Sequence, residues 1–158
     1  MTVVSYTADR IPDVVAYEKQ LRAEEDDWGW EIDDAYIRQV TESFRNPRFE
    51  DAVSFLAYEN GRVVGRIDAV KIPSYFDGSV KAYLDWICVL KSARHRGVAQ
   101  ALLAALKSRL KEEGIDTLIA ITADNDEAQR FYKSIPDSKM QSTGIWIDIN
   151  SSGTSGNP

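Results

Sequence analysis

The sequence predicts an α/β fold with a mixed sheet, and three features carry that prediction: a hairpin, a strand-helix-strand succession and the order of the remaining elements. The hairpin comes from two strand-like segments, residues 52–59 and 62–70, that flank Asn60-Gly61. This dipeptide suits a two-residue turn in which both central residues have positive φ. The middle of the chain is therefore expected to be antiparallel.

The strand-helix-strand succession follows the hairpin. Residues 81–90 are apolar on both faces, which indicates a strand in the interior of a sheet. A helical stripe occupies residues 97–113 and ends at Gly114, and a second apolar strand is expected at 117–123. Because such crossovers join parallel strands, the sheet should contain a parallel pair beside its mostly antiparallel half.

The other elements complete the order β-α-α-β-β-β-α-β-α-β. A strand is expected at residues 3–7, and a helix begins near Asp9 and Pro12. A second helix, capped by Asp33 or Asp34, stops at Asn46-Pro47. Further on we expect a loop, a short helix behind Asn125 and a last strand, at residues 72–79, 126–134 and 139–149 respectively.

Composition limits the domain organisation and the partners. With 158 residues and 44% hydrophobic content, the chain is long enough for one domain, which we assign to residues 1–150. Residues 151–158 contain no apolar side chain and are expected to be a disordered tail. The formal net charge of −6 argues against a nucleic-acid surface and favours a cationic partner.

The cysteine and histidine content limits the chemistry. Cys88 is the only cysteine, so no intramolecular disulfide can form, and the first residues do not resemble a signal sequence. We therefore expect a cytoplasmic protein, and no apolar segment approaches the roughly 20 residues needed to cross a bilayer. A single histidine, His95, without a cysteine cluster predicts no metal site.

One motif stands at the start of the predicted helix at 97–113. Residues Arg94 to Ala99 form the pattern R-x-x-G-x-A directly after the central strand. Backbone N–H groups at a helix N-terminus, together with arginine side chains, suit a pyrophosphate. The pattern is neither a Walker A nor a Rossmann motif, and a solvated basic turn is the alternative.

This motif, with Asn125 and Phe131-Tyr132 further on, resembles the GCN5-related N-acetyltransferases over essentially the whole chain before the tail. The resemblance implies a sheet that splays at the acetyl-CoA site, with acetyl-CoA as cosubstrate. It implies that the backbone of Ile87, Cys88 and Val89 bonds the pantetheine arm, that Asn125 contacts that arm, and that Tyr132 is the general acid for the departing thiolate. The pyrophosphate would be held by the loop residues Arg94, His95, Arg96, Gly97, Val98 and Ala99, with His95 simply solvated there.

Two of these assignments have structural alternatives. Tyr132 could be a core aromatic beside Phe131. Cys88 could carry the acetyl group covalently, but a small buried residue is the favoured interpretation, because the family usually transfers the acetyl group directly. After Tyr132 the chain departs from the K-x-G-F continuation of many members, which leaves the shape of the acceptor side open.

The stretch at residues 24–34 has seven acidic side chains around two tryptophans. The resemblance implies that this connection between the first two helices forms one wall of the acceptor site. Acidic side chains there attract an ammonium group, and indole rings stack on sugars or receive a cation. We assign to the acceptor Asp26, Asp27, Trp28, Trp30, Glu31 and, from the last strand, Asp148. The alternative is a solvated linker whose tryptophans cover the core.

A more distant resemblance, carried by residues 72–89, 94–107 and 122–128 and by the final IWIDIN, points to the aminoglycoside 3-N-acetyltransferases of type I. The expected acceptor is a cationic small-molecule amine such as an aminoglycoside. The alternatives are a polyamine, a protein or peptide amine, and a non-catalytic module that binds acetyl-CoA. A homodimer is possible by family analogy.

Amine transfer also needs a base. Asp85 is the first candidate because Tyr83, Asp85, Ile87 and Val89 are expected to share one face of the central strand. Asp124 is the second candidate. Each of these carboxylates could instead be a structural partner of a cation such as Arg66 or Lys81.

Overall fold

The computed structural model describes residues 1–25, 29–136 and 138–140. The chain forms two compact units, Met1–Ala120 and Ile121–Pro158, and each is described by itself. Several predictions lie outside the described residues: the tail at 151–158, the last strand beyond residue 140, and the acceptor residues Asp26, Asp27, Trp28 and Asp148. The assignment of residues 1–150 to one domain stays a prediction.

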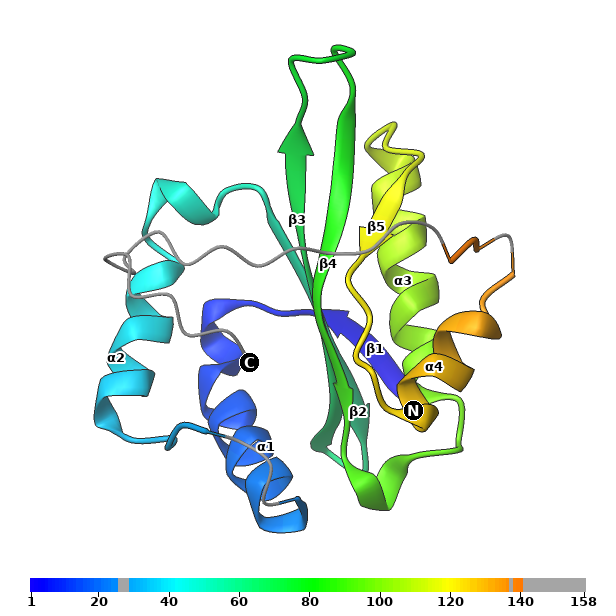
Figure 1. The fold of residues 1–158 in the computed structure, drawn as a ribbon. Coiled ribbons are helices and arrows are strands. Elements are labelled where there is room, and N and C mark those ends of the chain that lie inside the picture. Colours follow the sequence, from blue (N-terminus) through cyan, green and yellow to red (C-terminus); the bar gives the residue numbers. More distant parts are fainter. Residues whose placement is uncertain (26–28, 137, 141–158) are drawn as a thin grey trace, which may run out of the picture. The chain divides into compact units, whose positions relative to one another are not determined.

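The first unit is built on a five-stranded sheet whose strands lie in sequence order (Figure 1). Strands β1 to β4 pair antiparallel with their neighbours, and β4 pairs parallel with β5. The mixed sheet that the sequence predicts is therefore confirmed. The strands are β1 (Thr2–Ser5), β2 (Ala52–Glu59), β3 (Arg62–Pro73), β4 (Val80–Val89) and β5 (Leu118–Ala120).

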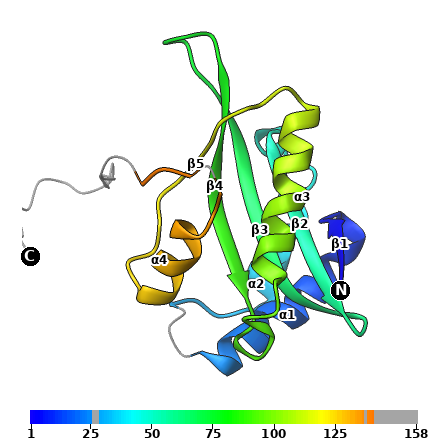
Figure 2. The ribbon, with the colours of Figure 1, turned by 90° about the vertical axis from the view of Figure 1, so that its right-hand side faces the viewer.

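Helices lie on both faces of this sheet. In Figure 1 and Figure 2, α1 and α2 lie on one face and α3 lies on the other. The first-unit helices are α1 (Ile11–Glu24), α2 (Asp34–Ser43) and α3 (Val98–Glu112), with short 3₁₀ turns at Ala8–Arg10, Pro47–Phe49 and Lys91–Ala93. The second unit contains α4 (Asp126–Lys133).

Local signals account for several element ends. Asn60 and Gly61 have φ of 49° and 74°, as a two-residue turn between β2 and β3 requires. Asp33 caps α2, because its Oδ1 accepts a 2.8 Å hydrogen bond from the Tyr36 N–H. Gly114 follows α3 with a φ of 75°, which relieves the strain that a side chain would meet there. These sequence predictions are confirmed.

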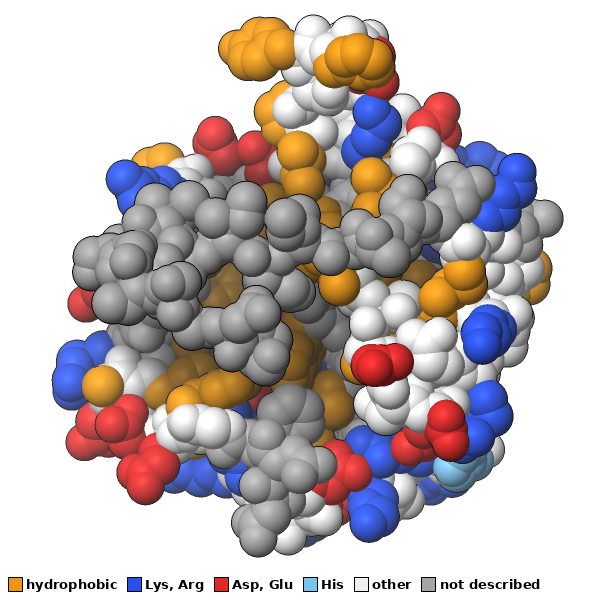
Figure 3. Space-filling view, in the orientation of Figure 1, with side chains coloured by type: hydrophobic (Ala, Val, Ile, Leu, Met, Phe, Trp, Pro, Cys, Tyr) orange, Lys and Arg blue, Asp and Glu red, His pale blue; other side chains and the backbone are white. Residues whose placement is uncertain are grey.

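The connection between β3 and β4 differs from the predicted loop at 72–79. Ile72 and Pro73 belong to β3, and a short turn joins the two long strands. Asp77 holds this turn by accepting hydrogen bonds from the Ser79 N–H at 3.0 Å and from Lys81 at 2.8 Å. Two aromatic side chains, Tyr75 and Phe76, stand fully exposed at the tip, where Figure 3 shows hydrophobic side chains that project from the surface.

A bulge changes which residues of β4 share a face. Asp68 pairs with Trp86 and Ala69 pairs with Leu84, so Asp85 is an extra residue opposite β3. Because paired residues point to the same side, Tyr83 and Trp86 share one face, whereas Ile87 and Val89 lie on the other. The prediction that Tyr83 shares a face with Ile87 and Val89 is therefore wrong.

The parallel pairing also ends at this bulge. The last paired residues of β4 and β5 are Leu84 and Ala120, so β5 is shorter than the predicted strand at 117–123. A bulge increases the local twist of its strand, which accounts for the loss of pairing one residue before Asp85. In the described part of the chain, no strand pairs with this edge of β4 from Asp85 to Val89.

The core explains why the helices hold the sheet. The apolar stripe that predicts α3 is buried along its whole length, at Val98, Leu102, Leu103, Leu106 and Leu110. On the other face, α1 buries Val14, Tyr17 and Leu21. Burying a side chain of this size contributes roughly 1.5–3 kcal/mol.

Gly65 allows α3 to approach the sheet closely. A Cβ at this position would lie 2.9 Å from Val98 Cγ1 and 3.1 Å from Leu102 Cδ1. We expect Gly65→Ala to destabilise the protein by about 1–3 kcal/mol through overpacking, and to displace the N-terminus of α3. Urea denaturation measures the loss. Gly29→Ala is the control, because a Cβ at Gly29 would meet no atom within 4 Å; equal stability of the two variants would contradict the prediction.

Candidate active site

The C-terminal part of β4 carries the residues predicted to bind the pantetheine arm. Ile87, Cys88 and Val89 all lie beyond the last residue that pairs with β5. The carbonyl of Cys88 accepts a 3.0 Å hydrogen bond from the Tyr17 hydroxyl. The carbonyl of Val89 accepts a 3.2 Å bond from Arg94 Nε. An extended strand edge without a partner strand can bond an amide-bearing chain, so this part of β4 fits the pantetheine arm.

The loop that follows β4 has the backbone geometry of an anion site. His95 has a φ of 60° and Gly97 a φ of 80°, both in the left-handed region. Gly97 is the N-cap of α3 and provides no side-chain cap, and the first α-helical bond runs from the Ala101 N–H to the Gly97 carbonyl at 3.0 Å. The N–H groups ahead of it, including those of Val98 and Ala99, have no helical acceptor, as at any helix start. This arrangement fits a phosphate group.

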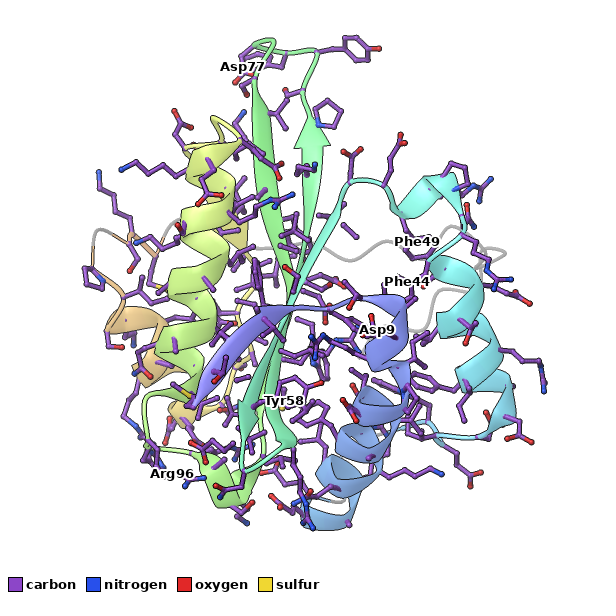
Figure 4. All side chains as sticks on the ribbon, turned by 180° about the vertical axis from the view of Figure 1, so that it is seen from behind. Asp9, Phe44, Phe49, Tyr58, Asp77 and Arg96 are labelled. Carbon is purple, nitrogen blue, oxygen red and sulfur yellow. The ribbon has the colours of Figure 1, made fainter. Side chains whose placement is uncertain are left out.

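The two arginines of the loop each have a carboxylate partner. Arg94 Nη1 lies 2.7 Å from Glu25 Oε1, and Nη2 donates to Oε2 at 2.8 Å. Arg96 Nη2 lies 2.9 Å from Glu59, and its side chain is half exposed. Figure 4 shows Arg96 near the N-terminal end of α3. The guanidinium of Arg94, predicted to add charge for a pyrophosphate, therefore bonds Glu25 and the Val89 carbonyl.

The acidic stretch begins with side chains that bind this same loop. Glu24 accepts hydrogen bonds from the Ser92 N–H at 3.0 Å and from its hydroxyl at 2.7 Å. Partial burial opposes ionisation of Glu24, but the hydrogen bonds from Ser92 and Gln20 outweigh it and lower the pKa of this carboxyl. Glu24 and Glu25 are thus structural partners of the loop.

Trp30 brings the same connection to β4. Its ring centroid lies 6.5 Å from that of Trp86. The Arg22 guanidinium lies 4.9 Å from the Trp30 ring centroid, and Arg22 Nε donates to the Trp30 carbonyl at 3.0 Å. The chain's own arginine therefore occupies a cation–π position on this ring, while Trp30 stays 50% exposed. Glu31 is also exposed.

The candidate base Asp85 is exposed at the bulge of β4. The two cations considered as its structural partners have other partners. Lys81 Nζ lies 2.8 Å from Asp77, and Arg66 pairs with Glu18 and Asp68. Asp85 is therefore not required to neutralise either cation. Asp124, the second candidate, is exposed in the second unit.

The environment of Cys88 disfavours a covalent role. Burial, opposed by the nearby Arg94 charge and a hydrogen bond from Tyr17, raises the pKa of the thiol to about 11. A thiol with this pKa is protonated at neutral pH, whereas the nucleophile in cysteine chemistry is the thiolate. The side chain of Cys88 is half-buried, and its environment favours a packing role over a covalent one.

The remaining predicted residues belong to the second unit. Asn125 caps α4, since its Oδ1 accepts a 2.8 Å bond from the Ala128 N–H. Tyr132 is partly buried, and its ring centroid lies 5.3 Å from that of Phe131. The roles of Asn125 and Tyr132 at the cofactor stay predictions.

Sequence reasoning missed an ionic cluster that joins α1 to β3 around the buried Glu18. Glu18, whose side chain is 5% exposed, lies 2.8 Å from Arg22 and 3.3 Å from Arg66, both on Nη1. Arg66 Nε in turn lies 2.7 Å from Asp68 Oδ2. The i, i+4 spacing of Glu18 and Arg22 predicts an ion pair on one face of a helix, but the same spacing is typical of pairs on an exposed helix surface. Only the packing of α1 on β3 distinguishes the two cases.

Comparisons with known proteins agree with this fold. The chain matches the model of the acetyltransferase (GNAT) family over residues 16–135. No curated protein sequence matches it. Among solved structures, the chain is similar to the aminoglycoside acetyltransferase meta-AAC0020 from an uncultured soil metagenomic sample, in complex with trehalose. That likeness has a TM-score of 0.78 and 16% identity, and covers 94% of this chain and 95% of the other.

Two further structures show the range of the likeness. AAC(6')-Iy, in complex with the bisubstrate analog CoA-S-monomethyl-acetylneamine, has a TM-score of 0.72 and 22% identity over 93% of this chain and 97% of that chain. A ribosomal-protein-alanine N-acetyltransferase from Brucella melitensis has a TM-score of 0.71 and 16% identity over 94% of this chain and 100% of that chain.

The family model spans most of the chain, and the mixed sheet with flanking helices is the fold expected for that family. The chain belongs to the acetyltransferase (GNAT) family. It is an acetyl-CoA-dependent N-acetyltransferase. In the part of the chain that the structure describes, no helix is long and apolar enough to span a membrane, and no three potential metal ligands gather.

Proposed function

We propose that the protein transfers the acetyl group of acetyl-CoA directly to a primary amine of a cationic small molecule of the aminoglycoside class. The observation that carries this proposal is the 6.5 Å separation of the Trp30 and Trp86 rings. It brings the acidic connection between α1 and α2 to the strand on which we propose that the thioester binds. The structural likeness to the aminoglycoside acetyltransferases meta-AAC0020 and AAC(6')-Iy supports the acceptor class.

Acceptor recognition in this proposal uses charge and ring stacking. The carboxylates of Asp26, Asp27 and Glu31 raise the local concentration of a polycationic acceptor. Trp28 and the exposed part of Trp30 stack on its sugar rings, and Asp148 binds one of its ammonium groups. The formal net charge of −6 has the sign that such an acceptor requires.

The cofactor in this proposal lies across β4 and the loop that follows it. The backbone of Ile87, Cys88 and Val89 bonds the pantetheine arm, and Asn125 contacts that arm. The pyrophosphate binds at the loop residues 94–99 and the start of α3. Two features support this assignment: the edge of β4 beyond Leu84, which no described strand pairs with, and the N-terminus of α3, which has no side-chain cap.

The transfer needs one group that accepts a proton and one that donates one. Asp85 accepts a proton from the acceptor ammonium, directly or through water, and Asp124 is the second candidate for this role. The neutral amine then attacks the thioester carbonyl carbon, so that a C–N bond forms as the C–S bond breaks. Tyr132 donates its phenolic proton to the departing sulfur and thereby stabilises the developing thiolate charge. The attacking nitrogen loses its second proton as the amide forms, and this proton, directly or through water, restores the phenol.

Thiol release from acetyl-CoA, measured against aminoglycosides, polyamines, amino acids and a lysine peptide, tests the proposal. We expect turnover on an aminoglycoside. In Asp26→Asn/Asp27→Asn we expect KM for that acceptor to rise about five- to tenfold with little change in kcat, because the lost carboxylates act on the encounter and on binding.

The matched control is Glu42→Gln/Glu50→Gln, which removes the same charge from exposed positions outside the acidic stretch and should leave KM unchanged. Turnover confined to the peptide would reject the aminoglycoside class. If KM for the aminoglycoside is the same in Asp26→Asn/Asp27→Asn as in the unmodified protein, the acidic stretch only connects α1 to α2 and does not bind the acceptor. Cofactor binding without turnover on any amine would favour a non-catalytic module.

A further inference from the structure

The C-terminal end of α1 is joined to the loop after β4 by two consecutive carboxylates. Glu24 accepts both the backbone and the side-chain hydrogen bond of Ser92, at 3.0 and 2.7 Å. Glu25 forms a two-point ion pair with Arg94, at 2.7 and 2.8 Å. These residues are 68 and 69 positions apart in the sequence, so the contacts are tertiary.

Arg94 joins a third element to this arrangement. Its Nε donates to the Val89 carbonyl at 3.2 Å, at the end of the strand proposed to bind the pantetheine arm. The ion pair and this bond use three of the five N–H groups of the guanidinium. The side chains of Arg94 and Glu25 are only 23% and 18% exposed, so solvent screens this pair less than an ordinary surface pair. The planar guanidinium of Arg94 matches the geometry of the Glu25 carboxylate at two points, and a lysine could not form this two-point contact.

We propose that Glu24, Glu25, Ser92 and Arg94 form a clasp that positions the acceptor wall and couples it to cofactor binding. In this arrangement Arg94 is a positioning residue rather than a pyrophosphate ligand. The inference rests on the proposed pyrophosphate site in this loop, and it changes only the role that the site gives to the Arg94 side chain. In the sequence, Glu25 directly precedes the residues that we propose for the acceptor wall, so fixing Glu25 on the loop restrains one end of that connection.

With Arg94 in the clasp, other groups of the loop must bind the pyrophosphate. The charge of the pyrophosphate is met by the N–H groups at the start of α3 and by Arg96. The pair of Arg96 with Glu59 is more exposed than that of Arg94, so it exchanges partners more easily. Because coupling between two sites is reciprocal, a cofactor that orders the wall also raises acceptor affinity, and the acceptor raises cofactor affinity by the same factor.

Hydrogen exchange on the full-length protein, with and without CoA, tests the clasp without any acceptor. We expect CoA to slow exchange of the backbone amides of residues 29–36 about tenfold in the unmodified protein, within the range typical of site coupling. In Glu25→Gln the effect should fall below twofold, while isothermal titration still detects CoA binding. Glu24→Gln and Ser92→Ala, which break the other half of the clasp, are measured in parallel in case Glu25→Gln folds poorly.

Asp77→Asn is the control, because it removes a carboxylate from another ion pair, at the tip of the β3–β4 hairpin (Figure 4). It should retain the full effect of CoA. If CoA binds and the wall exchanges at the same rate with and without it, or if a clasp variant that folds responds like the unmodified protein, the clasp is overturned. If CoA does not bind the unmodified protein at all, the assignment of the loop itself fails, which separates failure of the proposed cofactor site from failure of the clasp.

Discussion

Replacing Glu18 with alanine is expected to destabilise the protein by about 3–5 kcal/mol, which is the cost of breaking a buried ion pair by removal of one partner. The Glu18 side chain is 5% exposed and contacts both Arg22 and Arg66. The change removes the Glu18 carboxylate from both arginines, while Arg66 keeps its contact with Asp68. Urea denaturation with an unchanged m-value measures the loss, and the thermal midpoint should fall by roughly 6–20 °C.

Asp77→Asn provides the matched comparison for this variant. It also removes one carboxylate of an i, i+4 ion pair, but this pair lies at the surface, where such pairs contribute little. We expect its stability to be close to that of the unmodified protein. If Glu18→Ala is no less stable than Asp77→Asn, the cluster contributes nothing beyond an exposed pair and its burial has no energetic consequence.

Tyr132→Phe is expected to lower kcat about 100-fold or more, the range typical of lost general-acid catalysis. The change removes one hydroxyl and keeps the ring that lies 5.3 Å from Phe131, so packing within α4 is preserved. The dissociation constant of CoA, measured by calorimetry, should stay the same, because the proposed role concerns the departing thiolate. Steady-state kinetics with the best acceptor from the amine panel provides kcat.

Tyr58→Phe is the control for Tyr132→Phe. It removes a phenol that donates to Asp13 at 2.7 Å on the first unit and has no assigned role in transfer. This control should keep its activity. If Tyr132→Phe keeps full activity as well, Tyr132 is a packing neighbour of Phe131 and another group protonates the sulfur.

Arg94 shows why a motif alone cannot assign the role of a charged side chain. The pattern R-x-x-G-x-A correctly predicts a loop that ends in a helix start, because Gly97 and the apolar stripe of α3 are local signals. The partner of Arg94 is Glu25, which is 69 residues away in the sequence. No spacing rule connects the two, so the clasp could be found only in the folded chain.

The faces of β4 provide a second example. Alternation along the sequence puts Tyr83, Asp85, Ile87 and Val89 on one face, but Val89 is buried, as Leu84 is, whereas Asp85 is exposed. The register against β3 contains an extra residue at Asp85, which reverses the alternation from that point. A bulge depends on how two strands fit each other, so it leaves no mark in the pattern of one strand.

The sequence by itself determined the succession of elements from β1 to α4, the turn at Asn60-Gly61, the helix caps at Asp33 and Asn125 and the buried stripe of α3, because each depends on side chains within a few residues of one another. The tertiary structure decided the register of β4, the burial of Glu18 and the engagement of the first acidic residues by Ser92 and Arg94. These features depend on which distant segments pack together, and burial and charge pairing are fixed only when α1, β3, β4 and the loop after β4 meet.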